Sequence, residues 1–334
     1  MVALSDIQAS NAKLATNLPE GLVAVFVGGT RGIGETSLKQ FAKHTRKPRI
    51  YLIGRSEANA KRVIDKCKAL NNEGQYNFIG ADISLIRSVD EVCKDIASRE
   101  KAINLLFLTP GTFTVHTETP ENLHFFMSLN YYARTRFILN LLPLLRVAPD
   151  LRRVVTVFAG TKEGQVDTSD FQARKLSLMA SRGHVSSMIT LSIETLAKKA
   201  PEVSFVHVFP GMVTTDLGQD ISALPLRLVA RFYKFVLPLF AIPNEEAGER
   251  HLFFSTSGRY PPREGGAIGL TRDKGVEAVR GTDGNNGSGV YSISWDGTAL
   301  GEKAEKVLKK LRQEGVHDKV WEHTEDEFQR ITEG

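Results

Sequence analysis

The stretch from Leu22 to Gly34, LVAVFVGGTRGIG, decides the fold. Its first half is an apolar run typical of a buried parallel strand, and a helix is predicted to follow through Lys43. Glycines at this spacing allow a tight turn, close approach of a pyrophosphate, and helix–strand packing, while the helix start offers N–H groups to phosphates. A glycine-rich turn without a ligand is the alternative, and the readable strand and helix on either side disfavour it. The predicted cofactor-binding residues of this turn are Gly28, Thr30, Arg31, Gly32, Ile33 and Gly34.

Strands and helices alternate beyond this stretch. Strands are predicted over residues 49–53, 76–81, 103–108, 153–158 and 203–208, and helices over 57–70, 88–98, 123–146 and 176–200. Strict alternation predicts an α/β fold, a doubly wound (Rossmann) parallel sheet with helices on both faces.

The chain is expected to form a single domain with a C-terminal extension. We divide it into a lead-in (1–20), a dinucleotide-binding and catalytic domain (21–260), and an extension packed on that domain (261–334). The extension begins with a long loop rich in Gly, Arg, Asp and Asn over 261–289, and a charged helix follows at 301–311. Trp321 and Phe328 are expected to dock its end.

Composition excludes several classes of protein. The 334 residues are 42% hydrophobic and 24% charged, as in ordinary globular proteins. The net charge is +5, but the lysines and arginines are dispersed among acidic residues and no nucleic-acid-binding motif accompanies them. We therefore expect no nucleic-acid partner. Two scattered cysteines favour a reducing compartment, and with no secretory signal we predict the cytoplasm. No metal site is predicted, because the histidines lack ligand spacing.

The most apolar stretch, residues 224–243, contains two arginines, a lysine and internal prolines, which argues against a membrane span. We interpret this stretch as a lid over an apolar substrate or as a partner contact, with interfacial membrane contact as a minor alternative.

Cofactor choice depends on the end of the second strand. An acidic residue there would bind the ribose 2′-hydroxyl of NAD, but the sequence has Ile53-Gly54-Arg55. Arg55 and Arg31 supply positive charge where the 2′-phosphate of NADP would lie, and a guanidinium binds phosphate through two parallel hydrogen bonds. Although each could be an ordinary surface arginine, the pair predicts NADP(H).

These residues resemble the short-chain dehydrogenase/reductase family over about residues 20–260. The family's Thr-Gly-x-x-x-Gly-x-Gly pattern is matched from Val27 to Gly34, with Val27 in place of threonine. The resemblance implies further cofactor contacts, namely the adenine-pocket residues Asp82 and Ile83, Gly111 after the fourth strand, the Pro210-Gly211 turn, and Thr214 or Thr215 on the nicotinamide amide. It also implies a helix asparagine of the active site, matched by Asn130.

The catalytic half departs from that family. Its Asn-Asn-Ala-Gly is here Leu108-Thr109-Pro110-Gly111, its serine falls at about residues 158–160 without a hydroxyl, and its Tyr-x-x-x-Lys falls on Arg182 and Ser186. In the family the tyrosine exchanges a proton with the substrate. This chain therefore lacks the family's usual general acid. The sequence is similar to atypical members found among fungal secondary-metabolite tailoring enzymes.

Four residues are candidates for catalysis: Asn130, Lys162, Arg182 and Ser186. Arg182 and Ser186 share one helix face, and Arg182 could stabilise an oxyanion or enolate. Lys162, like its neighbour Glu163, lies in the loop after the fifth strand, at the sheet edge where ligands bind. His184, Tyr131 and Tyr132 are more simply explained as packed side chains.

Three functions remain open at this stage. The first is an NADP(H)-binding atypical oxidoreductase acting on an apolar small molecule in secondary metabolism. The second is a non-redox cyclase or isomerase that uses Arg182 for charge stabilisation, and the third is an NADP-binding regulatory protein without catalysis. The long helices would also suit a homo-oligomer.

Overall fold

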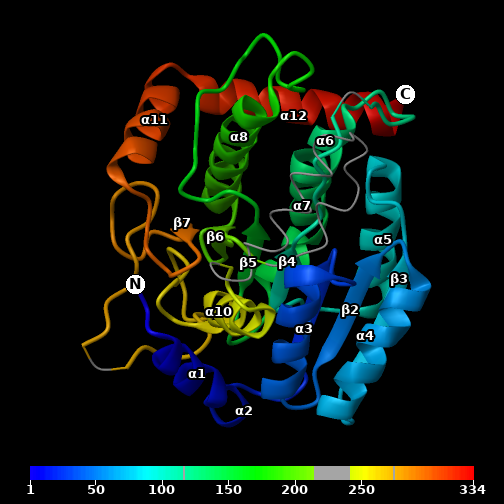
Figure 1. The fold of residues 1–334 in the computed structure, drawn as a ribbon, viewed down its shortest axis with the longest axis vertical. Coiled ribbons are helices and arrows are strands. Elements are labelled where there is room, and N and C mark those ends of the chain that lie inside the picture. Colours follow the sequence, from blue (N-terminus) through cyan, green and yellow to red (C-terminus); the bar gives the residue numbers. More distant parts are fainter. Residues whose placement is uncertain (116, 214–240, 274) are drawn as a thin grey trace.

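A seven-stranded parallel sheet forms the centre of the molecule (Figure 1). The computed structural model describes residues 1–115, 117–213, 241–273 and 275–334. The strand order is β3-β2-β1-β4-β5-β6-β7, and every pair of neighbours is parallel. The strands are β1 Val23–Val27, β2 Arg49–Gly54, β3 Gln75–Gly80, β4 Leu105–Leu108, β5 Arg153–Val157, β6 Ser204–Phe209 and β7 Val290–Ser294. The predicted doubly wound α/β fold is confirmed.

Helices cover both faces of this sheet. One face carries α3 Gly32–His44, α4 Glu57–Leu70 and α10 Asn244–Thr256, and the other carries α5 Ile86–Arg99, α7 Ala133–Arg146 and α8 Leu178–Lys199. β1 shows why its apolar run is continuous: Val23, Val25 and Val27 pack with α5, α7 and α8, whereas Ala24 and Phe26 pack with α3 and α10. A strand buried on both faces has no polar alternation.

The helix predicted over 123–146 has an interruption near its start. It consists of α6 Phe125–Met127, a π-helical turn η1 Ser128–Tyr132, and then α7. Such widened turns are frequent at functional sites, and this one carries Asn130. The sequence gives no sign of the irregularity, because its apolar residues keep a helical spacing.

The extension contributes a strand that the sequence analysis did not anticipate. β7 pairs with β6 through matched residues such as Val206 and Tyr291. After it, α11 Glu302–Gln313 and α12 Val316–Glu333 pack along the outer side of α8 and α7 (Figure 1). Trp321 and Phe328 of α12 are buried, as expected.

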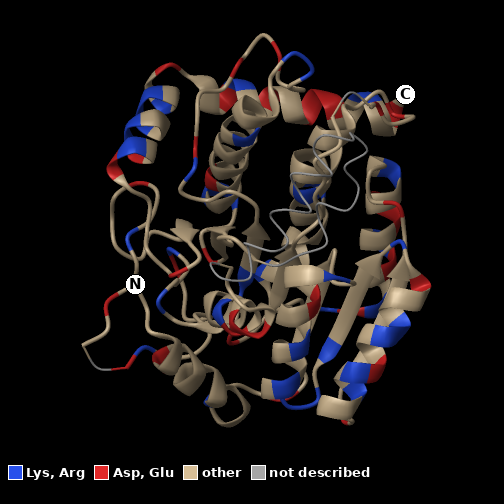
Figure 2. Ribbon diagram, in the orientation of Figure 1, with Lys and Arg blue, Asp and Glu red and all other residues tan. Residues whose placement is uncertain are grey.

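The lead-in forms α1 Leu4–Ala12 and the short α2 Leu14–Asn17, and it is attached to α10. The amide Nδ2 of Asn11 donates to the backbone oxygen of Glu249 (2.9 Å) and to its Oε2 (2.6 Å). Basic and acidic residues are interspersed over the helices in Figure 2.

The described residues include no helix long and apolar enough to span a bilayer. Most of the stretch interpreted as a lid or partner contact, residues 224–240, lies outside the described residues.

Candidate functional site

A cleft of about 710 Å³ opens at the carboxyl ends of the strands, beside the point where the strand order reverses between β1 and β4. Parallel α/β sheets bind ligands at such a point, in pockets of about 300–1,000 Å³. Its wall includes these residues predicted from the sequence: Gly28, Thr30, Arg31, Gly32, Ile33, Gly34, Arg55, Asp82, Ile83, Gly111, Asn130, Arg182, Pro210 and Gly211. The cleft therefore brings together residues from almost the whole predicted cofactor half.

The glycine turn forms one end of the cleft and requires glycine for two reasons. Gly28 and Gly32 have φ angles of +81° and +55°, which L side chains rarely adopt. A Cβ on Gly34 would lie 2.6 Å from both the backbone oxygen of Gly28 and Oγ1 of Thr109. The Thr109 hydroxyl lies 3.0 Å from the Val27 oxygen and 3.2 Å from the Gly28 oxygen and donates toward them, which ties the turn to β4.

The first turn of α3 leaves its N–H groups available to a ligand. The residue before the helix, Arg31, makes no side-chain cap. Glu35, in that turn, is held away by Arg62 through two hydrogen bonds of 2.7 and 2.6 Å. Burial opposes ionisation of Glu35, but Arg62 outweighs it and the pKa of Glu35 is lowered. The helix N-terminus with uncapped donors fits a pyrophosphate.

Two arginines flank the next part of the wall. Arg31 and Arg55 are exposed, and among the described residues no carboxylate lies within ion-pair distance of either. The Arg31 guanidinium lies 3.1–3.2 Å from the side-chain amide of Asn59. Asp82 accepts from both the N–H (3.1 Å) and the hydroxyl (2.8 Å) of Ser84. Positive charge without a counter-ion at this place fits a second phosphate.

Asn130 lies farther along the cleft and presents an acceptor. Its Nδ2 group donates to the backbone oxygens of Thr112 (3.0 Å) and Phe126 (2.9 Å), which uses both amide protons. A Cβ on Gly111 would lie 2.8 Å from its Oδ1 atom. Gly111 therefore leaves space beside the acceptor oxygen that any side chain would fill.

Arg182 and Lys162 lie against one aromatic ring, that of Phe209 at the end of β6. The Arg182 guanidinium carbon lies 5.2 Å from the ring centroid and the Lys162 ammonium 5.1 Å from it. Arg182 is half-buried in the cleft wall, and burial lowers its pKa. No described carboxylate lies within ion-pair distance of either cation. Lys162 is exposed and is not part of the cleft wall.

Ser186 is turned away from the cleft, contrary to the expectation that it shares a ligand-facing side with Arg182. Its hydroxyl donates to the backbone oxygen of Ala159 (2.6 Å) and its side chain is fully buried. The reason is geometric: Ser186 lies one turn of α8 beyond Arg182, and at that position the loop that follows β5 packs over the helix. The short hydroxyl is satisfied there, whereas the long arginine reaches the cleft.

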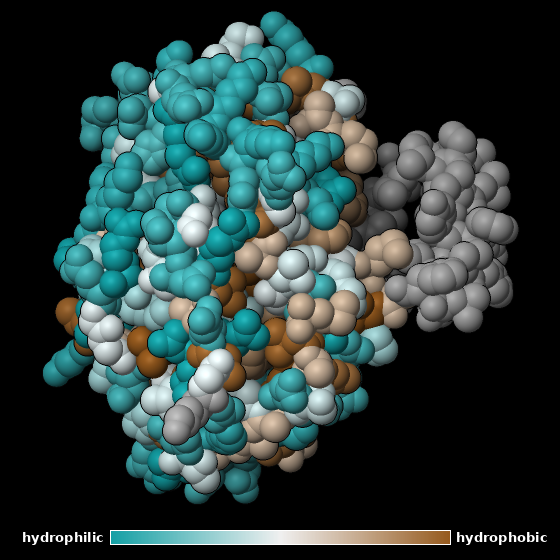
Figure 3. Space-filling view, turned by 90° about the vertical axis from the view of Figure 1, so that its left-hand side faces the viewer, coloured by the Kyte–Doolittle hydropathy of each residue, from teal (hydrophilic) through white to brown (hydrophobic). Residues whose placement is uncertain are grey.

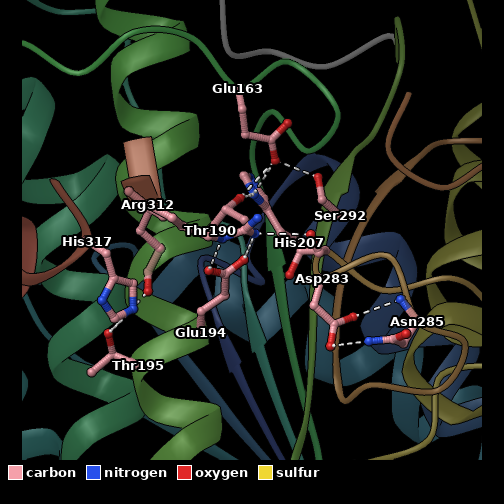
Figure 4. A network of polar contacts seen from close by, with 12 residues as sticks. Glu163, Thr190, Glu194, Thr195, His207, Asp283, Asn285, Ser292, Arg312 and His317 are labelled. Atoms are coloured by element: carbon pink, nitrogen blue, oxygen red, sulfur yellow. Dashed lines mark hydrogen bonds and ion pairs between the residues drawn. The ribbon is translucent and has the colours of Figure 1, made fainter. Parts of the chain in front are cut away.

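A buried polar network holds this loop, residues 159–164, to β7 (Figure 4). Oε1 of Glu163 accepts from the hydroxyls of Thr190 (2.8 Å) and Ser292 (2.6 Å). The Ala159 N–H donates to Nε2 of His207, which leaves the proton on Nδ1, 2.9 Å from the Thr190 hydroxyl. Burial raises the pKa of Glu163 and, together with the charge of Arg134, lowers that of His207 to about 3. The network fixes the loop, and it directs Glu163 away from Arg182.

The remaining aromatic and histidine candidates are packed side chains. The Tyr131 hydroxyl contacts the hydroxyls of Ser192 (2.7 Å) and Thr324 (2.6 Å), and the Tyr132 hydroxyl contacts Nε2 of His323 (2.7 Å). Both phenols thus bind α12 or α8 behind the cleft.

His184 is fully enclosed as well. Its ring nitrogens lie 3.1 Å from the Asp167 N–H and 3.1 Å from the Phe171 oxygen, so the ring fastens the segment before α8.

Arg134 is a wall residue that the sequence analysis missed. It is buried, and its guanidinium donates to the backbone oxygens of Leu108 (3.2 Å) and Pro110 and to the hydroxyl of Thr156 (2.7 Å). Burial lowers its pKa to about 9, so it remains charged at neutral pH, bonded to neutral groups. Its spacing of four from Asn130 places both on one helix face and could have revealed it.

The mouth of the cleft is apolar. Four exposed large hydrophobic residues belong to its wall: Phe113 (46% exposed), Leu178 (42%), Met179 (73%) and Met212 (54%). Figure 3 shows apolar surface gathering toward the right-hand side of that view, whereas the left-hand side is mostly hydrophilic. We call these four residues the apolar rim. Exposed apolar groups that cluster at a cleft indicate a ligand site.

The turn after β6 completes the described wall. Pro210 and Gly211 lie in it, and Gly211 has a φ of +75°. Thr214, predicted beside the nicotinamide, lies outside the described residues. Within the described wall, the titratable residues are Asp82 and the arginines at 31, 55, 134 and 182.

Comparisons with known proteins agree with this architecture. The family model of the short chain dehydrogenase matches residues 22–224. An oxidoreductase of Emericella nidulans is 39% identical over 333 residues, which cover 97% of each chain. An oxidoreductase of Emericella variicolor is 36% identical and covers 99% of this chain and 98% of its own.

Solved structures share the fold. L-sorbose reductase from Gluconobacter frateurii, complexed with NADPH and L-sorbose, has a TM-score of 0.54 at 17% identity, covering 71% of this chain and 90% of its own. The chain belongs to the short-chain dehydrogenase family, which confirms the resemblance noted in the sequence, and the family and its full-length relatives make it an oxidoreductase by class.

Proposed function

We propose that the protein is an NADP(H)-dependent oxidoreductase that acts on an apolar small molecule, in secondary metabolism. The observation that carries this proposal is the continuity of one cleft, from the glycine turn and the two exposed arginines to the apolar rim. A cofactor bound at the first end would meet a substrate bound at the second.

The roles of the residues follow from their chemistry. The turn at Gly28 to Gly34 and the first N–H groups of α3 would hold the pyrophosphate, and Arg31 and Arg55 would hold the 2′-phosphate. The reduced nicotinamide, when bound, supplies a hydride. Arg182 cannot release a proton near neutral pH, so we assign it the stabilisation of negative charge on the substrate oxygen.

A non-redox cyclase or isomerase is the second candidate, favoured by one observation. In the described wall, none of the titratable side chains near Asn130 and Arg182 is a tyrosine, histidine or lysine able to deliver a proton. Charge stabilisation without proton transfer would suit a rearrangement.

A cytoplasmic location and a homo-oligomer stay predictions of the sequence.

One assay separates the two candidates. The protein is incubated with NADPH and a panel of apolar enones and ketones, while product and nicotinamide absorbance are followed together. Reduced product in a one-to-one ratio with NADPH consumed is the expected result. Product without loss of NADPH would establish the non-redox alternative, and failure of NADPH to bind would overturn the proposal.

A further inference from the structure

The substrate end of the cleft carries positive charge that nothing in the described structure neutralises. Arg182 and Lys162 lie within 5.2 and 5.1 Å of the centroid of the Phe209 ring, from helix α8 and from the loop after β5. Arg134 is a further cation of the cleft wall, and its guanidinium carbon lies 5.8 Å from the centroid of the Phe158 ring. Like charges that share one aromatic ring repel each other, and the repulsion is relieved when an anion binds between or beside them.

Neighbouring carboxyl groups do not provide that anion. Glu163, next to Lys162 in sequence, directs Oε1 to Thr190 and Ser292, and burial raises its pKa. By contrast, other arginines of the molecule are paired: Arg136 with Asp90 (2.5 Å) and Arg62 with Glu35 (2.6 Å). Arg182 is thus an uncompensated cation in the half-buried wall, and Lys162 lies exposed beside it on the same ring.

The surroundings are apolar. Leu178 and Met179 precede Arg182 by one turn on α8, and Phe113 and Met212 line the same mouth. A planar guanidinium at the end of an apolar channel matches a planar oxyanion with two oxygens, since both N–H groups of the fork are then used.

We propose that this site takes an apolar molecule carrying a delocalised oxyanion, either a carboxylate or an ionised β-dicarbonyl, and that Arg182, assisted by Lys162, selects for that charge. The inference rests on the proposed function, because it names the substrate class of the same cleft.

The test measures binding of four probes by calorimetry: decanoate, dimedone (an ionised β-diketone), decanol and decyltrimethylammonium. We expect decanoate to bind about tenfold or more tightly than decanol, because a charge-assisted pair is worth more than the neutral contact it replaces. The cationic probe should bind most weakly. Dimedone separates the two sources of the oxyanion, since tight binding relative to decanoate favours an ionised β-dicarbonyl.

Variants locate the charge. R182Q should abolish the preference for decanoate over decanol, K162Q should reduce it, and R182K should retain part of it. K198Q removes an exposed charge at the far end of the same helix and should change nothing. Circular dichroism and the Tm of each variant verify folding. Equal affinities for decanoate and decanol, no decanoate binding, or an undiminished preference in the double variant R182Q/K162Q would each overturn the inference.

The outcome can be distinguished from failure of the proposed function. NADPH affinity is measured on the same samples, and R182Q should leave it unchanged because the phosphates are assigned to the other end of the cleft. The probes are titrated with and without NADPH. A protein that binds decanoate through Arg182 but never binds NADPH would retain this inference and lose the proposed function.

Discussion

Arginines in this molecule differ in whether a carboxylate binds them. Arg49 and Arg312 each bind a carboxylate through two hydrogen bonds, Glu100 and Glu194 respectively, and their role is structural. The arginines of the cleft wall have no such partner among the described residues. A cation in a concave site is available to a ligand when it lacks a carboxylate and is not enclosed by the fold, which holds for Arg31, Arg55 and Arg182 but not for the buried Arg134.

Arg55 provides the prediction at this scale. Arg55→Asp should weaken NADPH binding by about 1.5–3 kcal/mol, because a charge-assisted pair with the 2′-phosphate is replaced by repulsion. NADH affinity should rise or stay constant, since the carboxylate can accept from a ribose hydroxyl. Fluorescence titration with both dinucleotides gives the ratio of Kd values.

Lys68→Asp is the matched control, with the same change of charge at an exposed position of α4. It should leave the ratio unaltered. An unmodified protein with equal Kd values for NADH and NADPH would contradict the assignment of Arg55.

Sequence and structure agree best where a function depends on local backbone. The positive φ angles of Gly28 and Gly32 belong to a turn that its own glycines specify. The position of Ser186 was not predictable in the same way. Whether a side chain of a helix reaches the cleft depends on which loop packs over it, and the Ala159 oxygen that captures Ser186 is 27 residues away.

Among the elements, the junction of β1 and α3 has little tolerance for change. Thr109, at the end of β4, bonds to the turn from one side, while Gly34 lets α3 approach the strand from the other. The position of the helix N-terminus, and hence of its N–H donors, is set by this contact. Precise placement of the phosphate-binding N–H donors thus depends on the absence of a side chain at Gly34.

Gly34→Ala should therefore separate α3 from the turn. The added methyl would lie 2.6 Å from the Gly28 oxygen, and we expect a loss of about 1–3 kcal/mol of stability together with loss of NADPH binding. Thermal unfolding and fluorescence titration measure the two effects. Gly301→Ala is the control, because no atom lies within 4 Å of its added Cβ. Unchanged NADPH affinity in the Gly34→Ala variant would show that the turn is not the phosphate site.

Six of the seven strands were predictable because long alternating patterns of apolar strand and amphipathic helix are specified locally. β7 was missed, since five residues after a glycine-rich loop carry little signal and gain their identity from pairing with β6. The π-helical turn at Ser128–Tyr132 was missed for the opposite reason, because its sequence satisfies an ordinary helix.

At the scale of the whole molecule, burial keeps two histidines neutral. His207 and His251 are almost inaccessible, and burial together with a nearby arginine charge lowers their pKa values to about 3 and about 4, from an ordinary 6.5. The unfolded chain binds protons at these residues below pH 6.5, whereas the folded chain does not. Their contribution to stability is therefore complete above that pH and is lost as the pH falls toward 4.

We expect the free energy of unfolding to decrease in this window by up to about 1.4 kcal/mol per pH unit for each histidine. His251→Phe keeps a ring against Phe107 and Phe254. It should reduce the pH dependence of the free energy of unfolding, because one group fewer takes up a proton on unfolding. Urea unfolding at a series of pH values measures both slopes. Parallel curves for the two proteins would show that His251 does not titrate on unfolding.

The position of β7, α11 and α12 has a consequence for the way the chain is made. The phenol of Tyr131 can contact Thr324 only after 193 further residues have been synthesised. The sheet likewise gains its last strand only when residue 294 has been synthesised. During synthesis the outer side of α8 would stay uncovered until α12 has left the ribosome. A nascent chain of this kind exposes apolar surface for longer than one that closes its domain early, so its yield in a cell should depend on chaperones that shield the unfinished fold.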